Sequence, residues 1–204
     1  MIFSDTPPSL VLHQTNEMSN VWDDAGTIIS ISFSIWRLNT APGYYRIGDA
    51  INTARSKPIS GGYLISGRLS DPLNDGTLAK PTSYHLAWKD SASGAYRDVT
   101  IWVPVCPQGY VRLGVTATSG RTPSEGSIYC VKVEFTVEGT PDDWEFLWND
   151  YGNGGGYTIS LHQAKTQSKK NVVKSFRTIG SVADRNGRPT GSPYYLATKY
   201  VDQN

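Results

Sequence analysis

Apolar and polar residues alternate along short stretches of this chain, as they do along a half-buried β-strand. Between residues 29 and 35, isoleucine or phenylalanine stands at every odd position and serine at every even one. Residues 129–137 are rich in β-branched and aromatic side chains, which also favour a strand. Turn-forming sequences separate such stretches, among them Ala41-Pro42-Gly43, Asn74-Asp75-Gly76, Gly139-Thr140-Pro141 and the glycine-rich run at 152–156. No long stretch shows a helical stripe, so the pattern predicts an all-β fold.

The pattern occurs three times along the chain. Each copy begins with Trp-x-Asp, at Trp22, Trp88 and Trp148. The same register then brings Ile35-Trp36, Ile101-Trp102 and Leu161-His162 into corresponding positions. Further on, Tyr63, Tyr129 and Tyr195 recur at intervals of 66 residues. The sequence therefore predicts a single domain, 1–204, made of repeats at about 22–87, 88–147 and 148–204, with 1–21 completing the third unit.

Each repeat has room for about four strands of ordinary length. Three such units predict a pseudo-threefold β-prism of three repeated antiparallel sheets, with the two ends of the chain near each other. A β-trefoil is the alternative, although its units are usually shorter. The third copy carries an insertion at residues 163–176.

Composition narrows the choice of partners and compartment. The formal charge of +1 provides no overall field that would attract nucleic acid. The chain has no apolar run of membrane-spanning length and does not start with a basic and then apolar leader, so we expect a leaderless cytoplasmic protein, with non-classical release left open. We expect Cys106 and Cys130 to be unbonded, with Cys130 a buried apolar residue at the position of Leu64 and Leu196, although the sequence does not exclude a bond.

The second copy resembles a known protein family. Its residues Trp88-Lys-Asp-Ser-Ala-Ser-Gly, Asp98-Val-Thr-Ile-Trp-Val-Pro and Pro107-Gln-Gly-Tyr resemble the signature of the vacuolar protein sorting-associated protein 62 family. Ala92 departs from that signature, which has glycine there. The resemblance implies a fold and no defined activity. β-Prism domains of lectins and delta-endotoxins are a fold-level analogy.

The repeated tryptophans have two interpretations. We expect Trp22, Trp88 and Trp148, together with Trp36 and Trp102, to fill the core, because each indole can bury on the order of 200 Å². The alternative is that they form stacking platforms for sugar rings.

The aspartates that follow these tryptophans also have two interpretations. Asp24, Asp90 and Asp150 precede loops that contain Gly94 and Gly154 in the second and third copies. The carboxylates can accept hydrogen bonds from the backbone of their own turns. Alternatively they grip paired sugar hydroxyls, and the loop N–H groups complete a ligand site that is used up to three times. One aspartate in each loop is too few for tight calcium binding.

The insertion contributes Lys165, Lys169 and Lys170. They form either a solvated loop or a contact with a phosphate or an anionic headgroup. The chain has no His-x-x-x-His, Cys-x-x-Cys or Gly-x-Ser-x-Gly motif, so we expect neither a metal or cofactor nor an enzyme. The alternating segment from Thr27 to Ile35 also matches a pore-forming strand, but its recurrence in each copy favours scaffold.

These observations predict a non-catalytic recognition module. It would bind a glycan or a polar lipid headgroup at loops of the prism, on a membrane surface in the second case. The alternative is a toxin, or the targeting part of one, that acts on host membranes. The sequence does not predict the oligomeric state.

Overall fold

The computed structural model describes residues 10–27, 32–70, 76–90, 93–150, 159–165, 169–173, 180–184 and 187–203. Regular structure in these segments is strand, apart from three single-turn 3-10 helices, η1 (Val133–Phe135), η2 (Pro141–Asp143) and η3 (Thr198–Tyr200). The described segments contain no helix with the length and apolar character that a membrane crossing requires.

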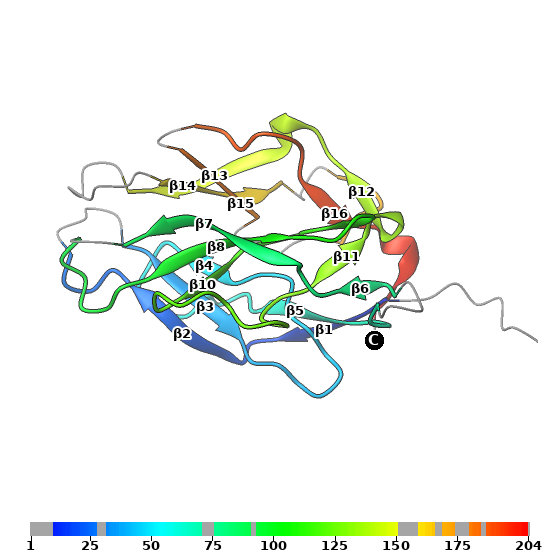
Figure 1. Cartoon of the computed structure of the whole chain (residues 1–204), viewed down its shortest axis with the longest axis horizontal. Coiled ribbons are helices and arrows are strands. Elements are labelled where there is room, and N and C mark those ends of the chain that lie inside the picture. The colour runs from blue at the N-terminus through cyan, green and yellow to red at the C-terminus, as the bar shows by residue number, and fades with distance from the viewer. Residues whose placement is uncertain are drawn as a thin grey trace, which may run out of the picture.

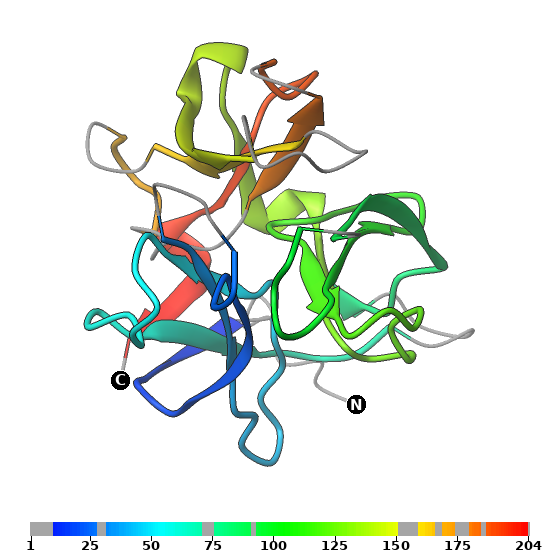
Figure 2. The same cartoon turned by 90° about the vertical axis from the view of Figure 1, so that its left-hand side faces the viewer.

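Three antiparallel sheets form one end of the molecule, one from each copy (Figure 1). Their strands are β2 (Met18–Asp23), β3 (Ser34–Leu38) and β4 (Ala50–Asn52); β7 (Ser83–Lys89), β8 (Thr100–Val105) and β10 (Thr116–Thr118); and β13 (Trp144–Asn149), β14 (Ile159–Ala164) and β15 (Ser181–Asp184). The second strand lies in the middle of each sheet. Figure 2 shows the three copies as three lobes around a common axis. The predicted β-prism is confirmed.

Three further sheets form the other end. Their strands are β1 (Leu10–Thr15) with β5 (Gly62–Ser66) and β17 (Val201–Gln203); β6 (Leu78–Ala79) with β11 (Cys130–Lys132) and β9 (Tyr110–Val111); and β12 (Thr136–Glu138) with β16 (Tyr194–Leu196). β1 runs parallel to β17, with Leu10 opposite Val201. The first and last described strands therefore lie side by side.

A β-bulge occurs at the same place in all three copies, just before each repeated tryptophan. A bulge re-aims the side chain that follows it. Trp22, Trp88 and Trp148 accordingly enter one core and are 1%, 4% and 2% exposed, which confirms their predicted role. The ring of Phe33 stacks on Trp148, with 4.5 Å between ring centroids, and tilts against Trp22 at 5.4 Å. A second core lies among the three sheets at the other end.

The prediction that Trp36 and Trp102 also fill the core is wrong. Strand alternation turns Ile35 and Ile101 inward and leaves the next side chain on the outer face, where both indoles are half-buried. The Trp36 indole N–H donates to the hydroxyl of its own strand residue, Ser34 Oγ, at 2.8 Å.

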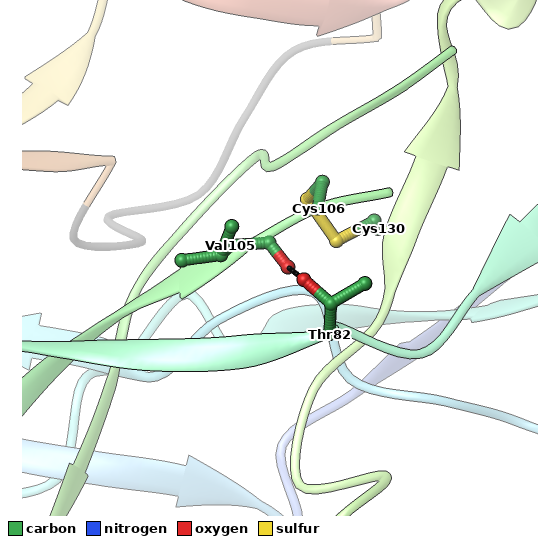
Figure 3. The surroundings of a disulfide bond; sticks show 4 residues. All are labelled: Thr82, Val105, Cys106 and Cys130. Atoms are coloured by element: carbon green, nitrogen blue, oxygen red, sulfur yellow. Dashed lines mark hydrogen bonds between the residues drawn. A yellow bond between two sulfur atoms is a disulfide. The ribbon is translucent and has the colours of Figure 1, made fainter. Parts of the chain in front are cut away.

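The two cysteines form a disulfide, so the expectation that they are unbonded is wrong (Figure 3). Cys106 follows β8, Cys130 begins β11, and their Cα atoms lie 5.8 Å apart. Beside the bond, the Thr82 hydroxyl donates to the carbonyl of Val105 at 3.1 Å. Matching Cys130 to leucines in the other copies did not reveal that β9, which follows Cys106, pairs with β11 and thereby brings the two sulfurs together.

Two predicted segments lie partly outside the described residues. Residues 28–31 of the proposed pore-forming strand are among them, and β3 begins at Ser34 in the place that β8 and β14 take in the other copies. Residues 166–168 and 174–179, which include part of the insertion, are also outside the described part of the chain.

Candidate functional site

Asp24 and Asp150 close the loops between the first two strands of their own copies. A carboxylate oxygen of Asp24 accepts the Phe33 N–H at 3.1 Å, and one of Asp150 accepts the Ile159 N–H at 2.8 Å. Asp150 also accepts the indole N–H of Trp88, from the neighbouring copy, at 3.3 Å. The aspartates are 0% and 2% exposed. The carboxylates therefore serve their own loops and lie away from solvent.

Asp90 is equally buried, at 1% exposure, but its carboxylate has fewer hydrogen-bond partners. Its N–H donates to the Val99 carbonyl at 2.8 Å, whereas its Oδ2 has no hydrogen-bond partner among the described residues. Burial raises the pKa of Asp90, a hydrogen bond with Ser93 lowers it, and the charge of Asp98 raises it again, with a net rise. The folded chain therefore carries a charged group that lacks the compensation found in the other two copies.

We expect Asp90→Asn to be more stable than the parent at pH 7 and to lose that advantage near pH 3. The folded pKa lies above the unfolded value of about 3.9, so the parent's free energy of unfolding falls as pH rises through the interval between them. Urea unfolding at both pH values measures this. Asp24→Asn is the control, because it loses an ion pair with Arg55 at 2.7 Å and should be less stable at pH 7. Equal destabilisation by both substitutions would contradict the expectation.

The other predicted ligand residues are scattered. Gly94 is exposed and has a positive φ of 84°, whereas Gly154 lies outside the described residues. Lys165 Nζ donates to the Asp142 carbonyl at 2.9 Å, and Lys169 Nζ lies 2.5 Å from Asp143 Oδ2. Two of the three lysines are thus held against the η2 turn, and the anion contact predicted for them stays a prediction. Lys170 is exposed.

The boundary between the first two copies contains a buried ion pair. Asp49 is 0% exposed and accepts two hydrogen bonds from Arg37, at 3.1 and 2.8 Å. It also accepts the Thr116 hydroxyl at 2.9 Å and the Ala117 N–H at 2.8 Å, both from β10 of the second copy. Burial lowers the pKa of Arg37, but the hydrogen bonds and charge of Asp49 outweigh it and raise that pKa. This network ties the two copies together.

The corresponding boundary between the second and third copies is hollow. A cavity of about 430 Å³ opens there, within the usual size range of ligand pockets. Its walls include Val103 and Arg112 from the second copy, Trp144 from β13 of the third sheet, and Gly180 and Tyr194 from the third copy. A Cβ atom on Gly180 would come within 2.8 Å of the Trp144 ring, so glycine leaves this wall open.

Arg112 supplies the positive charge of the hollow. It follows β9, whose pairing with β11 holds it at the boundary, and its Nη2 donates to Ser181 Oγ at 3.4 Å. Its Nε is buried and has no hydrogen-bond partner among the described residues. No carboxylate of the described segments pairs with it, and burial lowers the pKa of Arg112. A half-buried guanidinium with free donor capacity is a binding group for a carboxylate or a phosphate.

The repeat explains why one boundary is filled and the other is open. Val103 stands at the position of Arg37, and Val115 at that of Asp49, so the second copy lacks the ion pair that bridges to its neighbour. Arg112 itself corresponds to Arg46, which lies beside the Arg37 and Asp49 pair. Sequence reasoning missed this site. The available signal was the loss of a charged pair at two equivalent positions.

Comparison with known proteins identifies a matching family and a similar solved structure. The family model described as vacuolar protein sorting-associated protein 62 matches residues 8–186. The crystal structure of GNIP1Aa from Chromobacterium piscinae is similar, with a TM-score of 0.75 and 21% sequence identity. That similarity covers 96% of this chain and 38% of the GNIP1Aa chain, so this chain spans less than half the length of that protein. No curated protein matches the chain significantly. At this identity the likeness shows the fold.

Proposed function

This chain belongs to the vacuolar protein sorting-associated protein 62 family, and we propose that it is a non-catalytic recognition module that binds an anionic glycan or a polar lipid headgroup. The guanidinium of Arg112, which pairs with no carboxylate of the described segments, lies in the hollow between the second and third copies and carries the proposal. The site differs from the loop sites expected from the sequence, because all three loop aspartates are buried, and Asp24 and Asp150 accept hydrogen bonds from their own loops.

The chemistry of the hollow supports this ligand class. The guanidinium fork matches a carboxylate or phosphate in two-point contact. Thr190 and Ser192 place hydroxyl groups in the lining, and Trp144 and Tyr194 provide aromatic surface for the rest of the ligand. The described lining contains one histidine, His85, and no carboxylate.

Two further observations support a recognition role. GNIP1Aa carries the same fold within a longer chain, as a module does. Cys106, which forms the disulfide with Cys130, lies at the wall of the hollow. Disulfides persist in oxidising compartments such as the cell exterior, where glycans and the outer faces of membranes are exposed.

Arg112→Gln is expected to weaken binding about 10- to 100-fold, because hydrogen bonds to charged groups contribute roughly 1.5 to 3 kcal/mol. The melting temperature should not fall, since the substitution removes a half-buried charge for which the described residues provide no carboxylate partner. The measurement combines an array of neutral, sialylated and uronic acid glycans with flotation of liposomes containing phosphatidylserine or phosphoinositides.

Arg46→Gln is the matched control, because it changes the corresponding arginine of the first copy away from the hollow. It should leave binding intact. The proposal fails if the parent binds no acidic glycan or anionic liposome, or if both substitutions weaken binding equally. Dye leakage from the same liposomes would instead support the membrane-damaging alternative.

A further inference from the structure

The outer face of the third sheet carries a second hollow, distinct from that of Arg112. Its cavity volume is about 340 Å³, and it is lined by Trp144, Phe146, Asn149, His162, Gly187 and Arg188. Phe146 lies opposite His162 in the β13 and β14 pairing, and Trp144 lies opposite Ala164, so the two aromatic rings and the imidazole share one face of the sheet.

The repeat shows what is missing from this place. His162 corresponds to Trp36 and Trp102 of the other copies. Trp36 donates its indole N–H to Ser34 Oγ at 2.8 Å, and His162 Nε2 keeps the equivalent contact with Ser160 Oγ at 3.1 Å. An imidazole is smaller than an indole, so the third copy leaves part of the tryptophan's volume open.

The imidazole is buried with one nitrogen unused. His162 is 3% exposed, and burial lowers its pKa, so the ring is neutral at pH 7. Its Nε2 lies 3.1 Å from the carbonyl of Gly187, which can only accept, so Nε2 carries the proton. Nδ1 is then a bare acceptor, and it has no hydrogen-bond partner among the described residues. Because Nδ1 is buried, a ligand hydroxyl would supply the missing donor only after the side chains around this nitrogen move.

The remaining lining is aromatic and electrically compensated. Phe146 is 52% exposed and makes an edge contact with His162, with centroids 5.8 Å apart. Arg188 already pairs with Asp142, Nη1 to Oδ1 at 3.0 Å. An exposed aromatic ring beside a neutral acceptor, with no unpaired charge in the described lining, fits a ring that has an apolar face and a hydroxylated edge.

We propose that this hollow is a subsite for one neutral pyranose ring, which packs on Phe146 and donates a hydroxyl hydrogen to His162 Nδ1. This subsite would add a second contact to the proposed recognition function. It rests on that function only because both hollows are taken to bind parts of a ligand. Trp144 lines both hollows, so an acidic oligosaccharide that crosses this indole would reach Arg112 with its charged sugar and His162 with a neutral one.

The test uses methyl glycosides of mannose, galactose, glucose and N-acetylglucosamine, titrated into the ¹⁵N-labelled chain to tens of millimolar. The imidazole resonances of His162 and the indole resonance of Trp144 are expected to shift with at least one glycoside. His162→Trp restores the residue of the other copies, so it should fold, fill the hollow and weaken that response at least about tenfold. Phe146→Ala should weaken it as well, whereas Leu86→Ala, at the corresponding position of β7 in the second sheet, should not.

Two results would overturn the subsite: no glycoside shifts the His162 resonances, or the shifts persist in His162→Trp. Binding of an acidic ligand at Arg112 is read separately, through Arg112→Gln. A chain that keeps acidic ligand binding but fails the glycoside titration disproves the subsite and leaves the proposed function standing. A chain that responds to glycosides but binds no acidic ligand supports the subsite and disproves the role of Arg112.

Discussion

Trp88→Ala is expected to lower the free energy of unfolding by about 3 to 5 kcal/mol, as truncation of a buried aromatic ring does. Trp88 is 4% exposed and packs in the core between the sheets β2–β3–β4, β7–β8–β10 and β13–β14–β15. Alanine would leave a cavity at the axis, where residues from all three copies meet and the fold has little freedom to collapse around it. Denaturant unfolding followed by tyrosine and tryptophan fluorescence measures the loss.

Trp102→Ala is the matched control in the same sheet. Its ring is half-buried on the outer face, and its indole N–H donates to Thr118 Oγ1 at 2.9 Å. We expect a clearly smaller loss than for Trp88. A loss below about 1 kcal/mol for Trp88→Ala would show that the ring is not a core element and would favour a stacking platform.

The fold was predictable because each copy repeats the same local sequence pattern. The alternation of residues 29–35 and the Trp-x-Asp segments are patterns among neighbouring residues, and the Trp-x-Asp pattern recurs in all three copies. The bulge before each tryptophan explains why Trp22, Trp88 and Trp148 turn inward although apolar Leu86 and Phe146, two residues earlier in two copies, stay exposed. Periodicity alone could not distinguish these two sets.

The candidate site was not predictable in the same way, because it depends on contacts between copies. Nothing local to Arg112 indicates that its neighbour across the boundary is a glycine beside Trp144. The disulfide was missed for a similar reason, since the pairing of β9 with β11 brings Cys106 to Cys130. Positions where the copies differ were the useful signal. They include the change from Arg37 to Val103.

Asp49→Ala is expected to cost about 3 to 5 kcal/mol, because it breaks a buried ion pair and leaves its partner uncompensated. Asp49 accepts two hydrogen bonds from Arg37, one from the Thr116 hydroxyl and one from the Ala117 N–H. Arg37 would keep its charge at a side-chain exposure of 27%, and the Ala117 N–H would lose its acceptor. Thermal and urea unfolding of the variant measure the cost.

The double variant Arg37→Val with Asp49→Val tests whether charge or shape holds this boundary. Val103 and Val115 occupy these two positions in the second copy, so the backbone already accommodates valine at both. Removing both charges together avoids a buried unpaired ion, and the double variant should therefore lose less stability than Asp49→Ala alone. It should also remove the charged pair that lies beside Arg46, making this boundary resemble the hollow at Arg112. If the double variant were the less stable of the two, the ion pair would contribute net attraction between the copies, beyond satisfying its own buried groups.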